Sequence, residues 1–103
     1  MAAKLVKVAP SAELTPGAAK TVAVEGGEVA VFNVDGNLHA MDNTCPHRGA
    51  ALSEGRLDGC VVTCPWHGWQ FDVTNGQMLM SAASKQKTYK VVRQGDDVCV
   101  EVP

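Results

Sequence analysis

The stretch CPHRGAALSEGRLDGCVVTCPWHGW, residues 45–69, contains two Cys-Pro pairs, and a histidine follows each pair closely. The first motif has the spacing Cys45-x-His47, and the second, sixteen residues later, has the spacing Cys64-x-x-His67. A glycine also follows each histidine within two residues. Because proline and glycine are typical of turns, we expect both motifs to lie on loops.

These loops, about residues 43–50 and 63–69, interrupt a series of short, valine-rich runs. None of the runs has the length or the 3.6-residue period of an ordinary helix. The expected strands are Leu5–Val8, Thr21–Val24, Val29–Val34, Leu38–Met41, Cys60–Thr63, Trp69–Val73, Tyr89–Arg93 and Val98–Val102. Many short strands between turns predict an antiparallel all-β sandwich or barrel. A hairpin turn at Asp58–Gly59 would bring the two loops to the same end of this scaffold.

Length and composition limit the classes of protein to which the chain can belong. Its 103 residues predict a single domain over residues 1–103, and its 46% apolar content predicts a globular fold. A net charge of −2, with Lys and Arg scattered along the chain, argues against nucleic-acid binding.

The N-terminal segment MAAKLVKVAP is interrupted by Lys4 and Lys7, so it lacks the apolar core of a signal peptide. No run approaches the roughly 20 apolar residues of a membrane span. We therefore expect a cytoplasmic protein that does not bind a membrane. In the cytoplasm, cysteines serve as metal ligands or redox groups more often than they form disulfides.

Two thiols and two imidazoles suit either a tetrahedral zinc or a two-iron cluster with cysteines on one iron and histidines on the other. A disulfide between Cys45 and Cys64 is a third alternative, but it leaves both histidines unexplained. The single residue between Cys45 and His47 is a shorter gap than zinc ligands of one knuckle usually have. In a two-iron cluster these two residues can bind different irons, so the spacing favours an iron–sulfur cluster and leaves zinc as the alternative.

The longer stretch CPHRGAALSEGRLDGCVVTCPWHGWQFDVTNGQ, residues 45–77, resembles the Rieske [2Fe–2S] motif. The chain is also similar in length and strand pattern to the Rieske-type ferredoxins of bacterial aromatic-ring-hydroxylating dioxygenase systems. The resemblance implies a Rieske-type antiparallel β-sandwich with a cluster-binding subdomain formed by two loops. It also implies that one [2Fe–2S] cluster is bound by Cys45, His47, Cys64 and His67, with the histidine-bound iron nearest the surface.

The same resemblance implies a soluble one-electron carrier that is not itself an enzyme. Such a carrier, expected as a monomer, would pass electrons from an NAD(P)H-dependent flavoprotein reductase to a terminal oxygenase. In agreement, the sequence shows no nucleophile–base pair. One alternative is the small subunit of an assimilatory NADH-dependent nitrite reductase, which has a similar size and fold. An alternative of another class is a structural zinc-binding module used for protein interaction.

Two departures from related proteins concern the surroundings of the cluster. Rieske proteins of respiratory complexes have a disulfide between the loops, where this chain has Ala50 and Trp66, and hydroxyl donors after the second motif, where it has Trp69 and Phe71. Because hydrogen bonds to sulfur tune the potential, we expect a value near the low end of the window of roughly −150 to +300 mV. Similar ferredoxins often have a proline in a third loop over the cluster, and Met78–Lys87 contains none.

Overall fold

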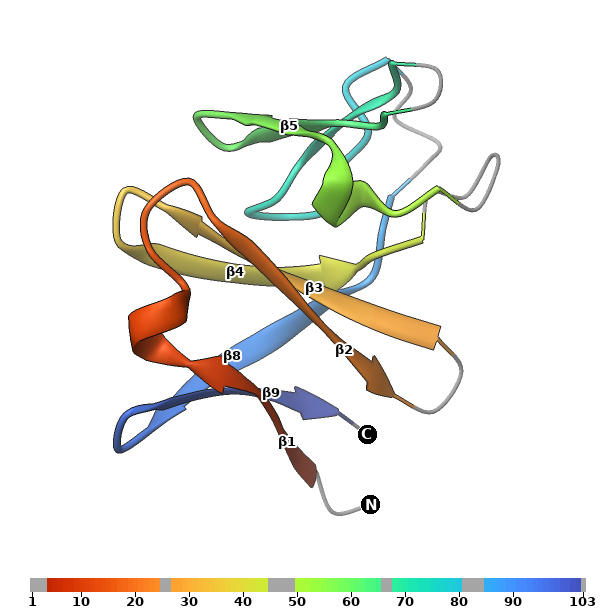
Figure 1. Cartoon of the computed structure of the whole chain (residues 1–103). Coiled ribbons are helices and arrows are strands. Elements are labelled where there is room, and N and C mark those ends of the chain that lie inside the picture. The colour runs from red at the N-terminus through yellow and green to blue at the C-terminus, as the bar shows by residue number, and fades with distance from the viewer. Residues whose placement is uncertain (1–3, 25–26, 45–49, 66–67, 81–84, 103) are drawn as a thin grey trace.

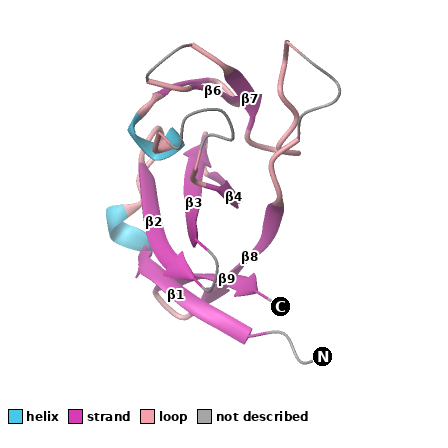
Figure 2. Ribbon diagram, turned by 90° about the vertical axis from the view of Figure 1, so that its right-hand side faces the viewer, coloured by secondary structure: helices cyan, strands magenta, loops and turns pink. Residues whose placement is uncertain are grey.

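The structure, a computed structural model, describes residues 4–24, 27–44, 50–65, 68–80 and 85–102. Its strands form two antiparallel sheets, and the smaller sheet lies over one end of the larger, curved one (Figures 1 and 2). The larger sheet has the order β1-β9-β8-β4-β3-β2, with β1 (Lys4–Pro10), β2 (Ala19–Val24), β3 (Gly27–Val34), β4 (Asn37–Asp42), β8 (Thr88–Gln94) and β9 (Asp97–Val102). The smaller sheet has the order β5-β6-β7, with β5 (Arg56–Asp58), β6 (Val61–Thr63) and β7 (Gln70–Asp72). Two short 3-10 helices, η1 (Ser11–Glu13) and η2 (Leu52–Glu54), complete the described elements and confirm the predicted all-β class.

Every expected strand overlaps an observed one, and the structure adds one strand that the sequence did not indicate. This strand, β5, has a single apolar residue, Leu57, between Arg56 and Asp58, so it lacks the apolar run that marked the others. It pairs with β6 from Arg56 opposite Thr63 to Asp58 opposite Val61. The predicted hairpin turn after Asp58 is therefore confirmed.

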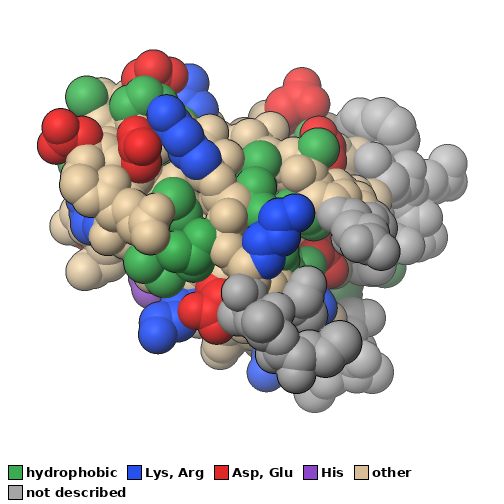
Figure 3. All heavy atoms as spheres, turned by 90° about the horizontal axis from the view of Figure 1, so that it is seen from below, with side chains coloured by type: hydrophobic (Ala, Val, Ile, Leu, Met, Phe, Trp, Pro, Cys, Tyr) green, Lys and Arg blue, Asp and Glu red, His purple; other side chains and the backbone are tan. Residues whose placement is uncertain are grey.

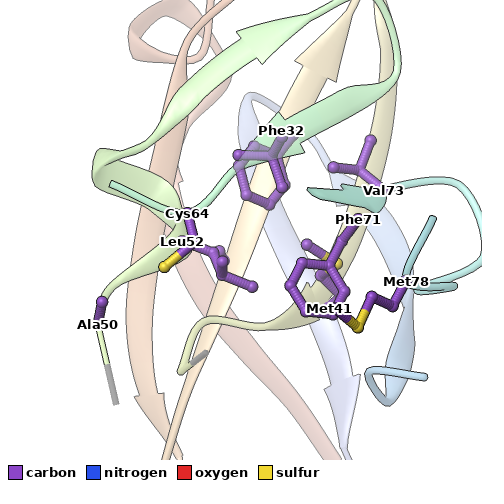
Figure 4. Packing of buried hydrophobic residues seen from close by; sticks show 10 residues of the cluster. Phe32, Met41, Ala50, Leu52, Cys64, Phe71, Val73 and Met78 are labelled. Carbon is purple, nitrogen blue, oxygen red and sulfur yellow. The ribbon is translucent and has the colours of Figure 1, made fainter. Parts of the chain in front are cut away.

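Strand β3 contributes to two apolar cores because its side chains alternate between the two faces of the larger sheet. Val29 and Val31 face a core that lies within the curve of this sheet. Ala30 and Phe32 face a second core, between the larger sheet and the smaller one. The remaining buried members of this second core are Met41, Ala50, Leu52, Val62, Cys64, Phe71, Val73 and Met78 (Figure 4). The smaller sheet is thus attached to the larger one through a shared apolar interface.

Strands β1 and β2 are the two edges of the larger sheet, and an open groove of about 420 Å³ lies between them. It is lined by apolar residues such as Leu5 and Val24 and by Lys4 and Lys7. From below, exposed hydrophobic side chains are seen among Lys, Arg and acidic residues (Figure 3). Lys4 pairs with Val102, so both ends of the described chain lie away from the smaller sheet (Figure 1).

Candidate metal centre

Of the four predicted ligands, Cys64 lies within the described part of the chain, and Cys45, His47 and His67 lie outside it. Cys64 follows directly after β6 and is only 2% exposed, with a free thiol. Its neighbours in the second core are apolar residues, including Ala50 and Leu52. The described residues alone contain no group of three or more metal-binding side chains.

The second loop is closed by two backbone hydrogen bonds, one made by the amide of Cys64 and one by its carbonyl. The amide of Cys64 donates to the carbonyl of Trp69 over 2.7 Å, and the amide of Gly68 donates to the carbonyl of Cys64 over 3.2 Å. Gly68 has a φ of +76°, which a residue without a Cβ adopts at no steric cost. Outside this turn, Thr63 pairs with Gln70 as the last pair of β6 and β7. The backbone around Cys64 is therefore fixed by the hairpin that carries it.

The first loop is closed in a comparable way, by an antiparallel bridge between Thr44 and Ala51. Next to this bridge, the carbonyl of Asn43 accepts a hydrogen bond from the amide of Leu52 over 2.7 Å. The side-chain oxygen of Asn43 accepts a second one from the amide of Ser53 over 2.8 Å. Asn43 is 2% exposed, so a buried side chain holds the two arms of the first loop together.

The bases of the two loops lie at the same end of the molecule. Figure 4 shows Ala50, Leu52 and Cys64 together on one side of the second core, whereas Phe71, Val73 and Met78 lie on the other. The β5–β6 hairpin makes this arrangement possible because it returns the chain from the first loop to the second. The prediction that both loops reach one end of the scaffold is therefore confirmed for their described bases.

A third segment, which follows β7, contacts the base of each loop. The amide of Leu79 donates to the carbonyl of Gln70 over 2.9 Å, next to the second loop. The side-chain nitrogen of Gln86 donates to the carbonyls of Asp42 and Thr44, over 3.1 and 2.7 Å, at the entry to the first loop. Leu79 and Met80 are about half exposed, at 52% and 56%. The segment 78–87 thus reaches both loops, and its residues 81–84 lie outside the described part.

Asn43 and Gln86 were not among the predicted site residues. Each is buried and bonds to backbone groups of segments that are distant along the chain. No local pattern in one sequence signals such a contact. Only the polar residue type within an otherwise apolar context could have drawn attention to them.

Near the first loop, the hydroxyl of Tyr89 donates to a carboxylate oxygen of Asp42 over 2.6 Å. Burial, followed by this hydrogen bond and by the negative charge of Asp42, raises the pKa of Tyr89 from 10.0 to about 12. The ammonium of Lys87 lies 5.2 Å from the centre of the same ring. Tyr89 is therefore neutral at physiological pH and connects β8 to the end of β4.

The position of Cys64, at the closed base of the second loop, fits a metal ligand. A lone thiolate in an apolar environment is unfavourable, and coordination to a metal compensates its charge. The other described cysteines differ from Cys64 in position. Cys60 is half-buried against the second core, and Cys99 is buried on β9 of the larger sheet.

Residues 4–95 match the sequence profile described as the Rieske [2Fe-2S] domain. The naphthalene 1,2-dioxygenase system ferredoxin component of Pseudomonas aeruginosa is 37% identical over 91 residues, which cover 87% of this chain and 88% of that one. A chain of the complex of reduced oxygenase and oxidized ferredoxin in carbazole 1,9a-dioxygenase has a TM-score of 0.85 and 34% identity, covering 93% of this chain and 91% of that one.

A putative NADH-dependent nitrite reductase small subunit from Mycobacterium tuberculosis has a TM-score of 0.88 over all of this chain and 98% of that one. Its sequence identity is 23%, so this likeness concerns the fold alone. Among the described residues, no helix is long and apolar enough to cross a membrane.

Proposed function

The chain belongs to the family of Rieske [2Fe–2S] domains, and we propose that it is the ferredoxin of an aromatic-ring dioxygenase system. The observation that carries this function is the similarity to dioxygenase ferredoxins over most of both chains. These relatives are components that supply a dioxygenase, and the chain is likewise an electron-transfer protein and not the catalyst. Its cofactor is one Rieske-type [2Fe–2S] cluster, which accepts and releases single electrons when bound.

We propose that Cys45, His47, Cys64 and His67 hold the cluster, and that residues 1–103 form one domain around it. The buried thiol of Cys64, within a loop that backbone bonds close, supports its assignment as a ligand. Thiolates from the two loops would bind one iron, and imidazoles from the two loops would bind the other.

The proposed partners are an NAD(P)H-dependent flavoprotein reductase and a terminal oxygenase. The complex of an oxygenase with a ferredoxin that resembles this chain supports the second partner. We propose that the chain works as a monomer in the cytoplasm and meets both partners through the end that carries the two loops.

The first experiment is electron paramagnetic resonance of the purified, reduced protein together with iron and sulfide analysis. We expect a Rieske-type signal and about two iron atoms per chain. A colourless protein that contains stoichiometric zinc would contradict the proposal and support a structural zinc-binding module.

Histidine ligation is tested with the variant His67→Cys. An additional thiolate makes the cluster more negative, so we expect a changed spectrum and a potential lower by roughly 100 mV or more. The matched control is His39→Ala, because His39 lies on β4 opposite Phe32, within the larger sheet. An unchanged spectrum in His67→Cys would contradict ligation by this residue.

The nitrite reductase small subunit is the second candidate, because a putative nitrite reductase NADPH small subunit is 29% identical to this chain with a TM-score of 0.78, covering 94% of this chain and 97% of that one. The two functions differ in the expected partner. Stable co-purification with a large siroheme protein would favour the second candidate, whereas electron transfer to an aromatic-ring oxygenase would favour the first.

A further inference from the structure

The β4–β8 ladder ends before it reaches the first loop. Its last pairs are Ala40 with Tyr89 and Met41 with Thr88, and one further backbone bond runs from the amide of Asp42 to the carbonyl of Lys87 over 2.9 Å. Beyond that point, the carbonyls of Asp42 and Thr44 receive their hydrogen bonds from the side-chain nitrogen of Gln86. The side chain of Gln86 thus takes the place of a backbone donor and extends the pairing to Thr44, the residue before Cys45 in the sequence.

The backbone of Gln86 is held by another segment, the turn that follows β7. Its amide donates to the carbonyl of Gly76 over 2.7 Å, in the turn that follows β7. A Cβ at Gly76 would overlap the carbonyl oxygen of Gln86, so the two backbones approach each other as closely as a glycine permits. Gln86 therefore connects the turn after β7 to the entry of the first loop. The strand β7 begins directly after Trp69, whose carbonyl accepts the hydrogen bond from the amide of Cys64.

Because Gln86 is buried, its side-chain amide depends on hydrogen bonds within the protein. Gln86 is 7% exposed, and only three polar residues, Asn33, Asn43 and Gln86, are buried among the described residues. A buried amide is unfavourable unless its hydrogen bonds are made, and the two N–H groups of one amide nitrogen suffice for two carbonyls. A methionine of similar length would fill the same space, but it would leave both carbonyls without this donor.

We propose that Gln86 is a positioning residue for the cluster, because it sets the first loop relative to the hairpin that carries Cys64. This inference rests on the proposed function, in which both loops supply ligands. Without the two side-chain bonds, the entry of the first loop gains freedom, and the ligands that follow it release the cluster more readily.

The test compares Gln86→Met and Gln86→Glu with the natural chain. Methionine keeps the length of the side chain and removes both donors, and a carboxylate keeps the shape but places negative charge against two carbonyl oxygens. Loss of cluster absorbance in excess iron chelator gives the release rate, and electron paramagnetic resonance gives the line width of the reduced cluster. We expect both variants to release the cluster about tenfold faster, which corresponds to about 1.4 kcal/mol in the barrier, and to show broadened lines.

Tyr89→Phe is the matched control. It removes one hydrogen bond from the same junction, but that bond ends on the side chain of Asp42 and not on a carbonyl at the loop entry. We expect its release rate to stay within about twofold of the natural chain, which is less than the effect of one typical hydrogen bond. Equal rates in Gln86→Met and the natural chain, or an equal acceleration in Tyr89→Phe, would overturn the inference.

Two further measurements test the role of Gln86 if Gln86→Met does not fold or if no cluster is bound. If Gln86→Met does not accumulate as folded protein, Gln86→Asn retains the amide one methylene short of its acceptors, and natural release kinetics in that variant would overturn the inference. If the natural chain shows no Rieske signal, the proposed function fails by itself. Hydrogen exchange in residues 40–53 then tests the role of Gln86 without a cluster, and we expect faster exchange there in Gln86→Met than in Tyr89→Phe.

Discussion

The six-stranded sheet and the three-stranded sheet differ in how their strands are held. In the larger sheet, β3 pairs with β4 over six residue pairs, from Val29 opposite Asp42 to Val34 opposite Asn37. In the smaller sheet, each pairing covers only three residue pairs. Four of the five pairings in the larger sheet cover five or six residue pairs, and the pairing of β4 with β8 covers two. Most of the larger sheet thus distributes its stability over many equivalent pairs, whereas the smaller sheet relies more on individual contacts.

Glycines and buried amides provide several of these individual contacts. Gly55 lies against the backbone of Thr63, and Gly76 lies against the backbone of Gln86. Asn43 joins the two arms of the first loop. The part of the molecule that carries the candidate site should therefore respond to single substitutions far more strongly than the larger sheet does.

The largest effect is expected for Cys64→Ala, which removes a proposed ligand from the loop that follows β6 of the smaller sheet. We expect complete loss of the cluster, measured as iron content and visible absorbance of the purified protein. Cys60→Ala is the control, because Cys60 lies four residues earlier and is only half-buried. Retention of a full cluster in Cys64→Ala would contradict the assignment of this ligand.

The second comparison adds a methyl group to one glycine next to each sheet and measures the loss of stability. Gly55 has a φ of −80°, so alanine is free of backbone strain there, but its Cβ would overlap the carbonyl oxygen of Thr63. We expect Gly55→Ala to lower the free energy of unfolding by about 3 kcal/mol or more, measured by urea denaturation. In the larger sheet, Gly36 has open space around its Cβ position and a φ of +93°, so Gly36→Ala should cost only about 1–2 kcal/mol. Equal costs would mean that the two sheets do not differ in this respect.

Two buried asparagines form a matched pair for the third comparison. Asn33 donates to the carbonyl of Leu14 and accepts from the amide of Gly36, in the larger sheet. Asn43 accepts from the amide of Ser53 at the first loop. Both alanine variants should lose about 2 kcal/mol of stability, because each leaves buried polar groups without a partner. Only Asn43→Ala should also accelerate cluster release in chelator, and acceleration by both variants would contradict a local role of Asn43.

The smallest expected effect is a loss of folding stability at high pH, where Tyr89 ionises. The pKa of Tyr89 is about 12 in the folded chain and 10.0 as its ordinary value, so the fold favours the neutral phenol. Its contribution to stability is complete below pH 10 and is lost as the pH rises towards 12. Tyr89 is the single tyrosine of the chain, so phenolate absorbance near 295 nm follows its titration directly. A midpoint near 10, or an equal loss of stability at high pH in Tyr89→Phe, would contradict this contribution.

The sequence predicted the parts of this molecule that depend on local patterns. Short, valine-rich runs marked β3 and the other long strands. In β3 the run is continuous from Val29 to Phe32, because both faces of this strand are buried. The charged edge strand β5 was missed because Leu57 is its single apolar residue. The site motif was recognisable from spacing, and the structure locates Cys64 at a closed loop, whereas Cys45, His47 and His67 stay predictions.

Asn43 and Gln86 could not be predicted because their partners are distant in sequence. Gln86 bonds to Asp42 and Thr44, which precede it by 44 and 42 residues. A single sequence contains no pattern that connects an amide to carbonyls at such a separation. The motif that contains the proposed ligands was therefore visible in the sequence, and the buried amides that contact the bases of the loops were not.

The pairing of Lys4 with Val102 has a practical consequence for attaching this protein to other objects. Both described ends of the chain leave the molecule from the end opposite the smaller sheet (Figure 1). A linker at either end, to an electrode surface or to a fused reductase, therefore lies away from the bases of the two loops. Tethered forms of the protein should present the loop end to the proposed oxygenase partner as freely as the untethered chain does.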